Sequence, residues 1–283
     1  ELVVIESQDL SSALKNIVIN PADVPTSGKE REYKSDSLDS RKLARELENG
    51  SLEGIYIPEP ANLELRNLTR RETKLTGNIV RIKNRIHSHL FFLGLKFRSW
   101  SGGSLKIMES DAAKRHDYAL QSDLRELRFL REERIRIIRD ERECLKHLNR
   151  EKVQDNLESI PGIGFRTAVV LQAELWDLSR FPNKDSLNSY VGLAPHTVGS
   201  GEHEEIKFGG NRKKKQLHYL LIESSWRAIR FNLEYRAKYG AMLAKGMCPQ
   251  RAISIIAKKL LLSIRAVWRC SSERYHSSRP TSV

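Results

Sequence analysis

Apolar residues recur in steps of three and four along two long stretches in the middle of the chain. The first stretch covers residues 65–93 and the second covers residues 120–148, and residues 100–104 break the pattern between them. Such steps place apolar side chains on one face of an α-helix. We therefore expect an antiparallel helical hairpin or coiled coil, which either packs within one chain or joins two copies as a dimerisation arm. The charged or polar interruptions of the two seams are Glu72, His89, Arg131, Arg134 and Glu141.

Short apolar runs flank a helical pattern within the first sixty residues. Residues 17–19 and 55–57 are predicted strands, and residues 39–47 have helical spacing that ends at an Asn-Gly pair. A strand–helix–strand order favours a parallel sheet. This part of the chain is therefore expected to be an α/β unit.

From residue 157 onward the pattern changes to a compact and mostly helical domain. One apolar run has the period of a core helix rather than that of a partner-binding groove. Its residues are Ile253, Ile255, Ile256, Leu260, Leu261, Ile264 and Val267. The expected fold class is α/β plus α, with the α/β unit over residues 1–60, a helical arm over 61–155, the helical domain over 156–270 and a disordered tail over 271–283.

The positive charge of the chain gathers at one end. The 283 residues carry a formal net charge of +13, yet residues 207–283 hold 17 Lys and Arg against 3 Asp and Glu, and the residues before them hold 32 against 33. A concentrated basic surface can neutralise phosphates, and counterion release then supplies affinity for nucleic acid. A solvated basic face without a polyanionic partner is the alternative.

Membrane and zinc-binding classes fit the sequence poorly. No run of ~18 apolar residues is present, and the first residues lack a signal-peptide pattern. Cys144, Cys248 and Cys270 lie far apart without a C-x-x-C pair, which argues against a zinc site and against a disulfide framework. Unpaired thiols are typical of a reducing cytosol, so we expect a cytoplasmic protein.

Two glycines mark a tight turn at Pro161-Gly162-Ile163-Gly164. Together with the apolar helix that follows, this segment has the spacing of a helix-hairpin-helix element. Glycine lets the backbone turn tightly, and the N–H groups that open the next helix face outward towards an anion such as a DNA phosphate. Gly162 and Gly164 are therefore candidate nucleic-acid contacts, and a tight turn that binds nothing is the alternative.

A serine, Ser200, stands in a glycine-rich stretch before a cluster of cations. The cations are Lys207, Arg212, Lys213, Lys214 and Lys215. A serine that attacks a phosphodiester needs cations to stabilise the charged transition state and a group to take its proton, and the sequence places no histidine for that role. The cations are candidate RNA and DNA contacts, whereas Ser200 also fits an ordinary turn.

Two carboxylates, Asp36 and Asp39, stand three residues apart at the start of a predicted helix. This spacing places both on one face, about one turn apart. Carboxylate pairs can hold Mg²⁺ for in-line displacement at phosphorus. Capping of the helix by either aspartate is the alternative.

The order of these features resembles one family, the transposases of the insertion sequence 110 (110/116/902) type. The resemblance covers nearly the whole chain and is strongest over residues 157–226. The motifs that carry it are Ile19-Asn20-Pro21-Ala22-Asp23-Val24-Pro25, Asp36-x-x-Asp39-x-Arg41, Pro161-Gly162-Ile163-Gly164, Tyr190-Val191-Gly192-Leu193-Ala194-Pro195, Ser200-Gly201 and Gly210-Asn211.

The resemblance implies a ribonuclease-H-like domain with a DEDD carboxylate set, a coiled-coil arm and a domain with a catalytic serine. It implies that Ser200 forms a phosphoserine link with DNA, and that Asp36 and Asp39 are the last two carboxylates. It further implies Mg²⁺ in a composite site built by two protomers of a homo-oligomer, and a structured guide RNA that selects the DNA sites.

The chain departs from the family pattern at its N-terminus. It opens at Glu1 on an apolar run, so we expect it to be truncated there, with the family's first aspartate missing. Glu6 is a candidate for the family's glutamate, although the stretch between Glu6 and Ile17 is shorter than the pattern expects. We therefore expect weak Mg²⁺ binding and no recombination by this polypeptide alone.

Three functions remain open at this point. The first is a DNA recombinase that uses Ser200 and Mg²⁺, and the second is a catalytically inactive remnant that only binds nucleic acid. The third is a junction-processing nuclease that uses carboxylates alone. Replacement of Ser200 by alanine separates the first from the third, because only the recombinase needs the hydroxyl.

Overall fold

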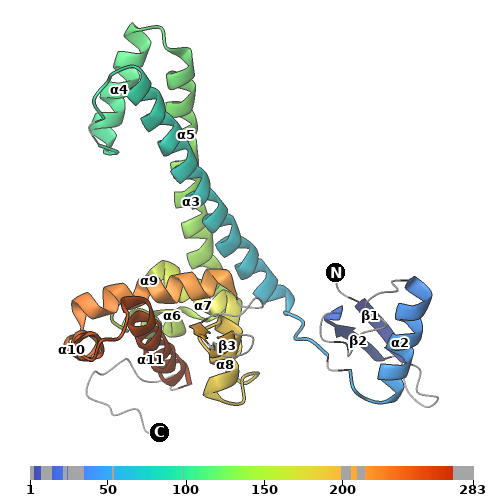
Figure 1. The fold of residues 1–283 in the computed structure, drawn as a ribbon. Helices are drawn as coiled ribbons and strands as arrows, with labels where there is room; N and C mark the ends of the chain where they lie inside the picture. The colour runs from blue at the N-terminus through green and yellow to red at the C-terminus, as the bar shows by residue number, and fades with distance from the viewer. Residues whose placement is uncertain are drawn as a thin grey trace. The chain divides into compact units, whose positions relative to one another are not determined.

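The computed structural model describes residues 3–7, 15–21, 24, 35–52, 54–97, 99–198, 205–208 and 214–269. The chain divides into two compact units, residues 1–60 and residues 61–283. In the described part, a two-stranded antiparallel sheet lies in each unit, and helices make up most of the second unit (Figure 1). The predicted tail over 271–283 lies outside the described residues.

The first unit contains two strands and a helix. Strands β1 (Val3–Ser7) and β2 (Lys15–Ile19) pair antiparallel, with Glu6 opposite Asn16. Helix α2 (Asp36–Glu48) begins three residues before the predicted start. Its N-cap is Ser35, whose side chain accepts a hydrogen bond from the N–H of Leu38.

The predicted strand over residues 55–57 is wrong, because this segment has no regular strand structure. A backbone hydrogen bond still connects this segment to β2: the N–H of Ile55 donates to the carbonyl of Val18 at 2.8 Å. Pro58 then ends the segment without an N–H group to extend a ladder. The expected parallel sheet is therefore not seen, and the described strands of this unit pair antiparallel.

The arm of the second unit contains three helices, α3 (Pro60–Phe92), α4 (Gly102–Lys114) and α5 (Tyr118–His147). Figure 1 shows α3 and α5 running together away from the C-terminal helices, with α4 at the far end. The predicted helical hairpin is thus present within one chain. The sequence pattern missed α4, which begins after the cap Ser101.

The distal half of the arm has its own apolar core. The predicted seams face each other there, and α4 adds two buried side chains. The fully or nearly buried members are Leu75, Ile79, Ile82, Ile86, Leu90, Met108, Ala112, Leu120, Leu124, Leu127 and Leu130. These side chains are thus buried within a single chain, and whether the arm also joins two copies stays a prediction.

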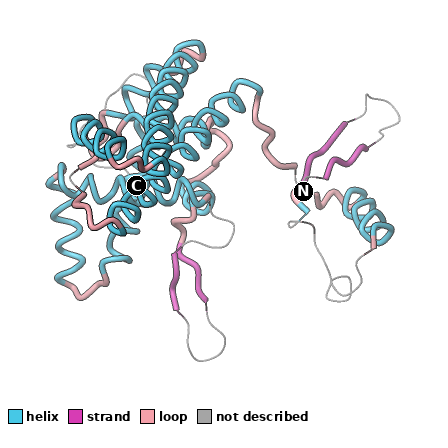
Figure 2. Tube along the Cα trace, turned by 90° about the horizontal axis from the view of Figure 1, so that it is seen from above, coloured by secondary structure: helices cyan, strands magenta, loops and turns pink. Residues whose placement is uncertain are grey.

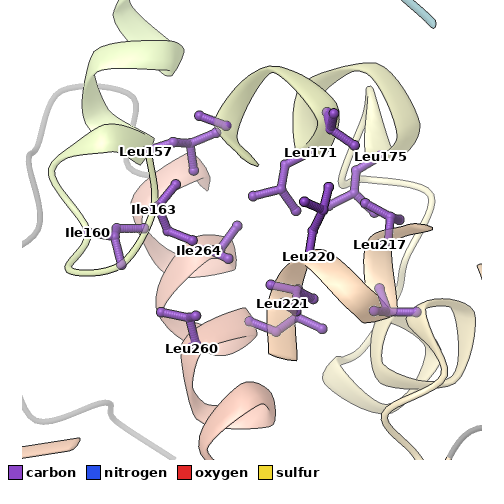
Figure 3. Close-up of a cluster of buried hydrophobic side chains, with 14 of the residues drawn as sticks. Leu157, Ile160, Ile163, Leu171, Leu175, Leu217, Leu220, Leu221, Leu260 and Ile264 are labelled. Atoms are coloured by element: carbon purple, nitrogen blue, oxygen red, sulfur yellow. The ribbon is translucent and has the colours of Figure 1, made fainter. Parts of the chain in front are cut away.

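The C-terminal part is built from helices around a second core. Its elements are α6 (Glu151–Glu158), α7 (Phe165–Leu175), α8 (Lys184–Val191), β3 (Pro195–Val198), β4 (Glu205–Phe208), α9 (Lys215–Phe231), α10 (Leu233–Ala244) and α11 (Pro249–Arg269). Figure 3 shows leucines and isoleucines of α7, α9 and α11 pointing towards one another. The prediction of a core helix over 253–267 is confirmed, although Ile255 is only partly buried.

Polar contacts fix the first half of α3 against α7. The side-chain amide of Asn62 donates to the carbonyl of Ala173 at 2.7 Å. Arg66 and Arg70 both pair with Glu174, at 2.8 and 3.0 Å. Burial alone would raise the pKa of Glu174, but the two guanidinium groups outweigh it and lower the pKa. The buried, ionised carboxylate of Glu174 therefore holds the start of the arm against α7.

The helices and the cysteines of the described residues can be compared with the predictions on membranes and thiols. None of its described helices combines the length and the apolar character that a membrane span requires. Cys144 is buried and Cys248 is exposed, and both are free thiols. Cys270 lies outside the described residues.

Candidate nucleic-acid interface

Helix α9 packs one face against the core of the C-terminal part and exposes the other. Its inner face buries Leu217, Leu221, Ser224 and Ala228. Counted along the sequence, residues 214–269 hold 12 Lys and Arg against 2 Asp and Glu. Nine of these 12 cations are exposed, and Lys258, Lys259 and Arg265 of α11 are partly buried. Most of the charge is therefore open to solvent, as a phosphate-binding surface requires.

The outer face of α9 carries two aromatic rings between two cations. Lys215, Tyr219, Trp226 and Arg230 follow each other at helical spacing and are all exposed; we call these four residues the α9 stripe. The side chain of Tyr219 is 63% exposed and that of Trp226 is 39% exposed. Trp226 packs edge-on against Tyr239 of α10, with ring centroids 5.6 Å apart. Cations bind phosphates, so the two ends of the stripe suit the backbone of a nucleic acid.

The predicted glycine turn joins α6 to α7 and packs against the inner face of α9. Gly162 has a φ of +91°, and a Cβ atom there would lie 2.4 Å from the carbonyl oxygen of Ser224 and 2.8 Å from the backbone nitrogen of Ala228. The glycine is therefore required by backbone conformation and by close packing. Gly164 is exposed, with open space around it, and caps α7 without a side chain.

A cation pair flanks an aromatic ring where the β3–β4 hairpin leaves the helices. The guanidinium of Arg180 lies 4.7 Å and the ammonium of Lys214 lies 5.6 Å from the ring centroid of Tyr190. The N–H of Lys214 also donates to the carbonyl of Tyr190. Figure 2 shows β3 and β4 as the lower pair of magenta strands, which project from the helical body.

The structure places some of the predicted basic and nucleophilic residues. Lys214 and Lys215 are exposed at the start of α9, and Lys207 lies in β4. Ser200, Arg212 and Lys213 lie outside the described residues. In the chain, Ser200 belongs to the segment that connects β3 with β4.

The predicted carboxylates belong to the first unit. Asp36 and Asp39 are exposed in the first turn of α2, where Ser35 rather than either aspartate accepts the capping hydrogen bond. Glu6 lies in β1. Within the described residues no cluster of three or more Asp, Glu, His or Cys side chains that could hold a metal ion is found. Asp36 and Asp39 are thus two exposed carboxylates three residues apart at the start of α2.

Two buried glutamates lie where the arm meets α7. Glu72 of α3 accepts from Arg134 of α5 at 2.7 Å, and its other oxygen lies 2.8 Å from Arg166 of α7. Glu141 of α5 is also buried, and burial together with the nearby Glu72 carboxylate raises the pKa of Glu141 to about 7. Arg166 is thus engaged with the arm and does not face outward from the glycine turn.

Sequence reasoning missed the aromatic members of the α9 stripe. Tyr219 and Trp226 stand in a segment where Leu217, Leu220 and Leu221 carry the core period. The usable signal was their phase, because Lys215, Tyr219, Trp226 and Arg230 occupy the side of the helix opposite Ser224 and Ala228. Aromatic rings on a polar face, rather than their presence alone, point to binding.

Comparison with known proteins decides the family. The profile of the "Transposase IS116/IS110/IS902 family" matches residues 154–240, and a profile of DEDD transposases of the IS110 type matches residues 10–93. The chain belongs to the IS116/IS110/IS902 family of transposases. The two matches cover the C-terminal helices up to α10 and the segment from β2 through α3.

Three curated relatives come from bacterial insertion elements. An uncharacterized 43.6 kDa protein of insertion element IS110 from Streptomyces coelicolor is 33% identical over 45% of this chain and 31% of its own length. The transposase for insertion sequence element IS1328 of Yersinia enterocolitica is 27% identical over 45% and 38%. The transposase for element IS1111A of Coxiella burnetii is 26% identical over 35% and 27%. The alignments thus span less than two thirds of each relative.

Proposed function

We propose that this family member binds and recombines the DNA of an insertion sequence, with Ser200 as the nucleophile and a structured RNA as its guide. The observation that carries the binding part is the charge of the described residues 214–269, together with the exposed α9 stripe. A surface of this kind binds the phosphate backbone with an affinity that falls steeply with salt. The family membership supports the DNA partner.

The serine chemistry rests on the place of Ser200 in the chain. Ser200 belongs to the β3–β4 connection, and Arg180 and Lys214 lie beside Tyr190 at the base of that hairpin. Attack of the Ser200 hydroxyl on a phosphodiester forms a Ser–O–P bond and releases the DNA hydroxyl as leaving group. Cations near the phosphate would stabilise the charge that develops in the transition state.

The metal part of the proposal concerns the unit over residues 1–60, which we assign to a ribonuclease-H-like DEDD domain. Asp36 and Asp39 are carboxylates on one face of α2, and oxygen donors of this type suit Mg²⁺. Two exposed carboxylates hold Mg²⁺ weakly, since the ion keeps most of its water. Glu6 is the further candidate ligand. A bound Mg²⁺ would polarise phosphate oxygens.

Binding is tested by the salt dependence of affinity. The affinity for a short fluorescein-labelled DNA duplex is measured by anisotropy at several salt concentrations. Replacement of Arg212, Lys213, Lys214 and Lys215 by glutamine should lower the slope of log K against log salt by about 3–4 units, because each phosphate contact contributes about 0.9. A protein that binds neither DNA nor RNA at low ionic strength would overturn the proposal.

The serine role is tested by a covalent adduct. With Mg²⁺ and DNA from an end of the insertion sequence, the chain should form a protein–DNA product that survives denaturants and is absent in Ser200→Ala. Salt-dependent binding without an adduct favours the remnant that only binds nucleic acid. Cleavage that is unchanged in Ser200→Ala favours the carboxylate nuclease.

A further inference from the structure

The far end of the arm exposes three aromatic rings. The side chains of Phe91 and Phe92, at the last turn of α3, are 81% and 87% exposed, and Tyr118, the first residue of α5, is 73% exposed. His89 lies 3.0 Å from Asp117, so the end of α3 and the start of α5 are adjacent. Phe91 and Phe92 are consecutive and Tyr118 follows Asp117, so the three exposed rings lie near one another, as the apolar residues of a binding surface do.

The same end of the arm is basic. Residues 81–118 hold 8 Lys and Arg against 3 Asp and Glu. Lys96, Lys114 and Arg115 are exposed there, with Lys114 and Arg115 at the end of α4. Of the acidic residues, Asp117 caps α5 and pairs with His89, and Glu109 pairs with Arg128. We call Phe91, Phe92, Lys96, Lys114, Arg115 and Tyr118 the arm tip.

The composition of the arm tip selects among possible partners. In a contact between two identical tips, the three cations of one copy would face those of the other, with Asp111 as the exposed carboxylate nearest in sequence to offset them. A nucleic acid instead supplies phosphates for the cations. Three exposed rings then call for unpaired bases, because the bases of a duplex are already stacked on one another.

We propose that the arm tip binds an unpaired stretch of RNA, with bases stacked on Phe91, Phe92 and Tyr118 and phosphates near Lys96, Lys114 and Arg115. RNA is the natural source of unpaired bases, since its loops and bulges display them while cellular DNA is duplex. The inference gives the RNA partner of the proposed function a second surface, in a different part of the unit from the α9 stripe. It requires no chemistry at Ser200.

The test uses the full chain and two probes, fluorescein-labelled oligo(U) and a labelled DNA duplex. The variant F91S/F92S/Y118S should bind oligo(U) about tenfold more weakly or worse, since one stacked base is worth that factor. Binding of the duplex should be unchanged. A control variant, F129S/I135S, removes two exposed apolar side chains from the middle of α5 and should bind both probes as the wild type does.

Several results would overturn the inference. Unchanged oligo(U) binding in F91S/F92S/Y118S excludes the tip as an RNA surface. A loss on oligo(dT) without a loss on oligo(U) assigns the tip to single-stranded DNA instead. A dimer that becomes a monomer in light scattering, with oligo(U) binding intact, makes the tip a self-association surface. If the wild type binds oligo(U) through the tip but ignores duplex DNA, the inference stands and the proposed DNA function fails.

Discussion

The guanidinium of Arg166 lies 2.8 Å from the carboxylate of Glu72, and this pair joins the helix that follows the glycine turn to the arm. Glu72 also accepts from Arg134 at 2.7 Å and from the hydroxyl of Thr76 at 3.0 Å. One carboxylate of α3 therefore connects α5 and α7. A buried charge with two partners fixes the angle at which these helices meet.

Replacement of Glu72 by alanine should destabilise the chain by about 1–3 kcal/mol. Loss of one partner of a buried ion pair costs up to about 5 kcal/mol. Here both arginines are 38% exposed and can regain water, and the neighbouring Glu141 can ionise beside them, which reduces the cost. The free energy of unfolding is measured by urea titration at neutral pH.

The control for this variant is Glu126→Ala, which removes a surface partner of Arg85 and leaves Asp123 in place. Exposed pairs contribute about 0–1 kcal/mol, so this change should be nearly silent. Equal effects of the two substitutions would mean that the Glu72 contacts do not hold the arm.

Glu141 makes the stability of the arm depend on pH. Its pKa is raised from 4.5 to about 7 in the folded chain. Between these values the unfolded state releases a proton that the folded state keeps, so stability is full below about 4.5 and falls as the pH rises towards 7. The loss is about 1.4 kcal/mol per pH unit inside that window.

The variant Glu141→Gln should lack this loss. Its stability relative to the wild type should be lowest at pH 4.5, rise up to about pH 7 and then level off, in urea titrations at several pH values. Glu143→Gln changes an exposed carboxylate on the same helix and is the matched control. A constant difference between Glu141→Gln and the wild type across the window would show that Glu141 is not held protonated.

Gly162→Ala should destabilise the C-terminal part by about 3 kcal/mol or more. A left-handed φ costs a non-glycine residue about 1–2 kcal/mol, and the added Cβ would meet the backbone of α9 at 2.4 Å. Gly164→Ala meets nothing within 4 Å and should cost less than about 1 kcal/mol. Thermal melts of both variants check the difference. Similar melting temperatures for the two variants would contradict the close packing of Gly162 against α9.

Helix faces were predictable because their contacts are local in sequence. The seams of α3 and α5 and the core face of α11 follow directly from periods of three and four. The pairing of strands could not be predicted in this way, because the partner of β2 is fixed by contacts outside the strand itself. Residues 55–57 have strand-forming side chains, yet β1 is the described neighbour of β2.

The buried charges show a second limit of sequence reasoning. Glu72, Arg134 and Glu141 look like interruptions of an apolar seam, and only the meeting of three helices turns them into one network. The aromatic residues of the arm tip have the same difficulty, because they lie at helix ends where no helical phase marks the exposed side. A tyrosine or a phenylalanine indicates a core in the sequence, and its exposure appears only once the neighbouring helices are placed.

The α9 stripe should account for about two phosphate contacts on duplex DNA. Lys215→Gln together with Arg230→Gln removes the two cations at its ends, so the slope of log K against log salt should fall by about 1.8 units. Both side chains are exposed, and the fold should be unaffected. The matched control, Arg125→Gln with Arg139→Gln, removes the same charge from the exposed surface of α5. If the slope falls equally in both double variants, the stripe affects binding only through the net charge of the chain. If it falls only in the Lys215 and Arg230 variant, the DNA backbone lies along α9.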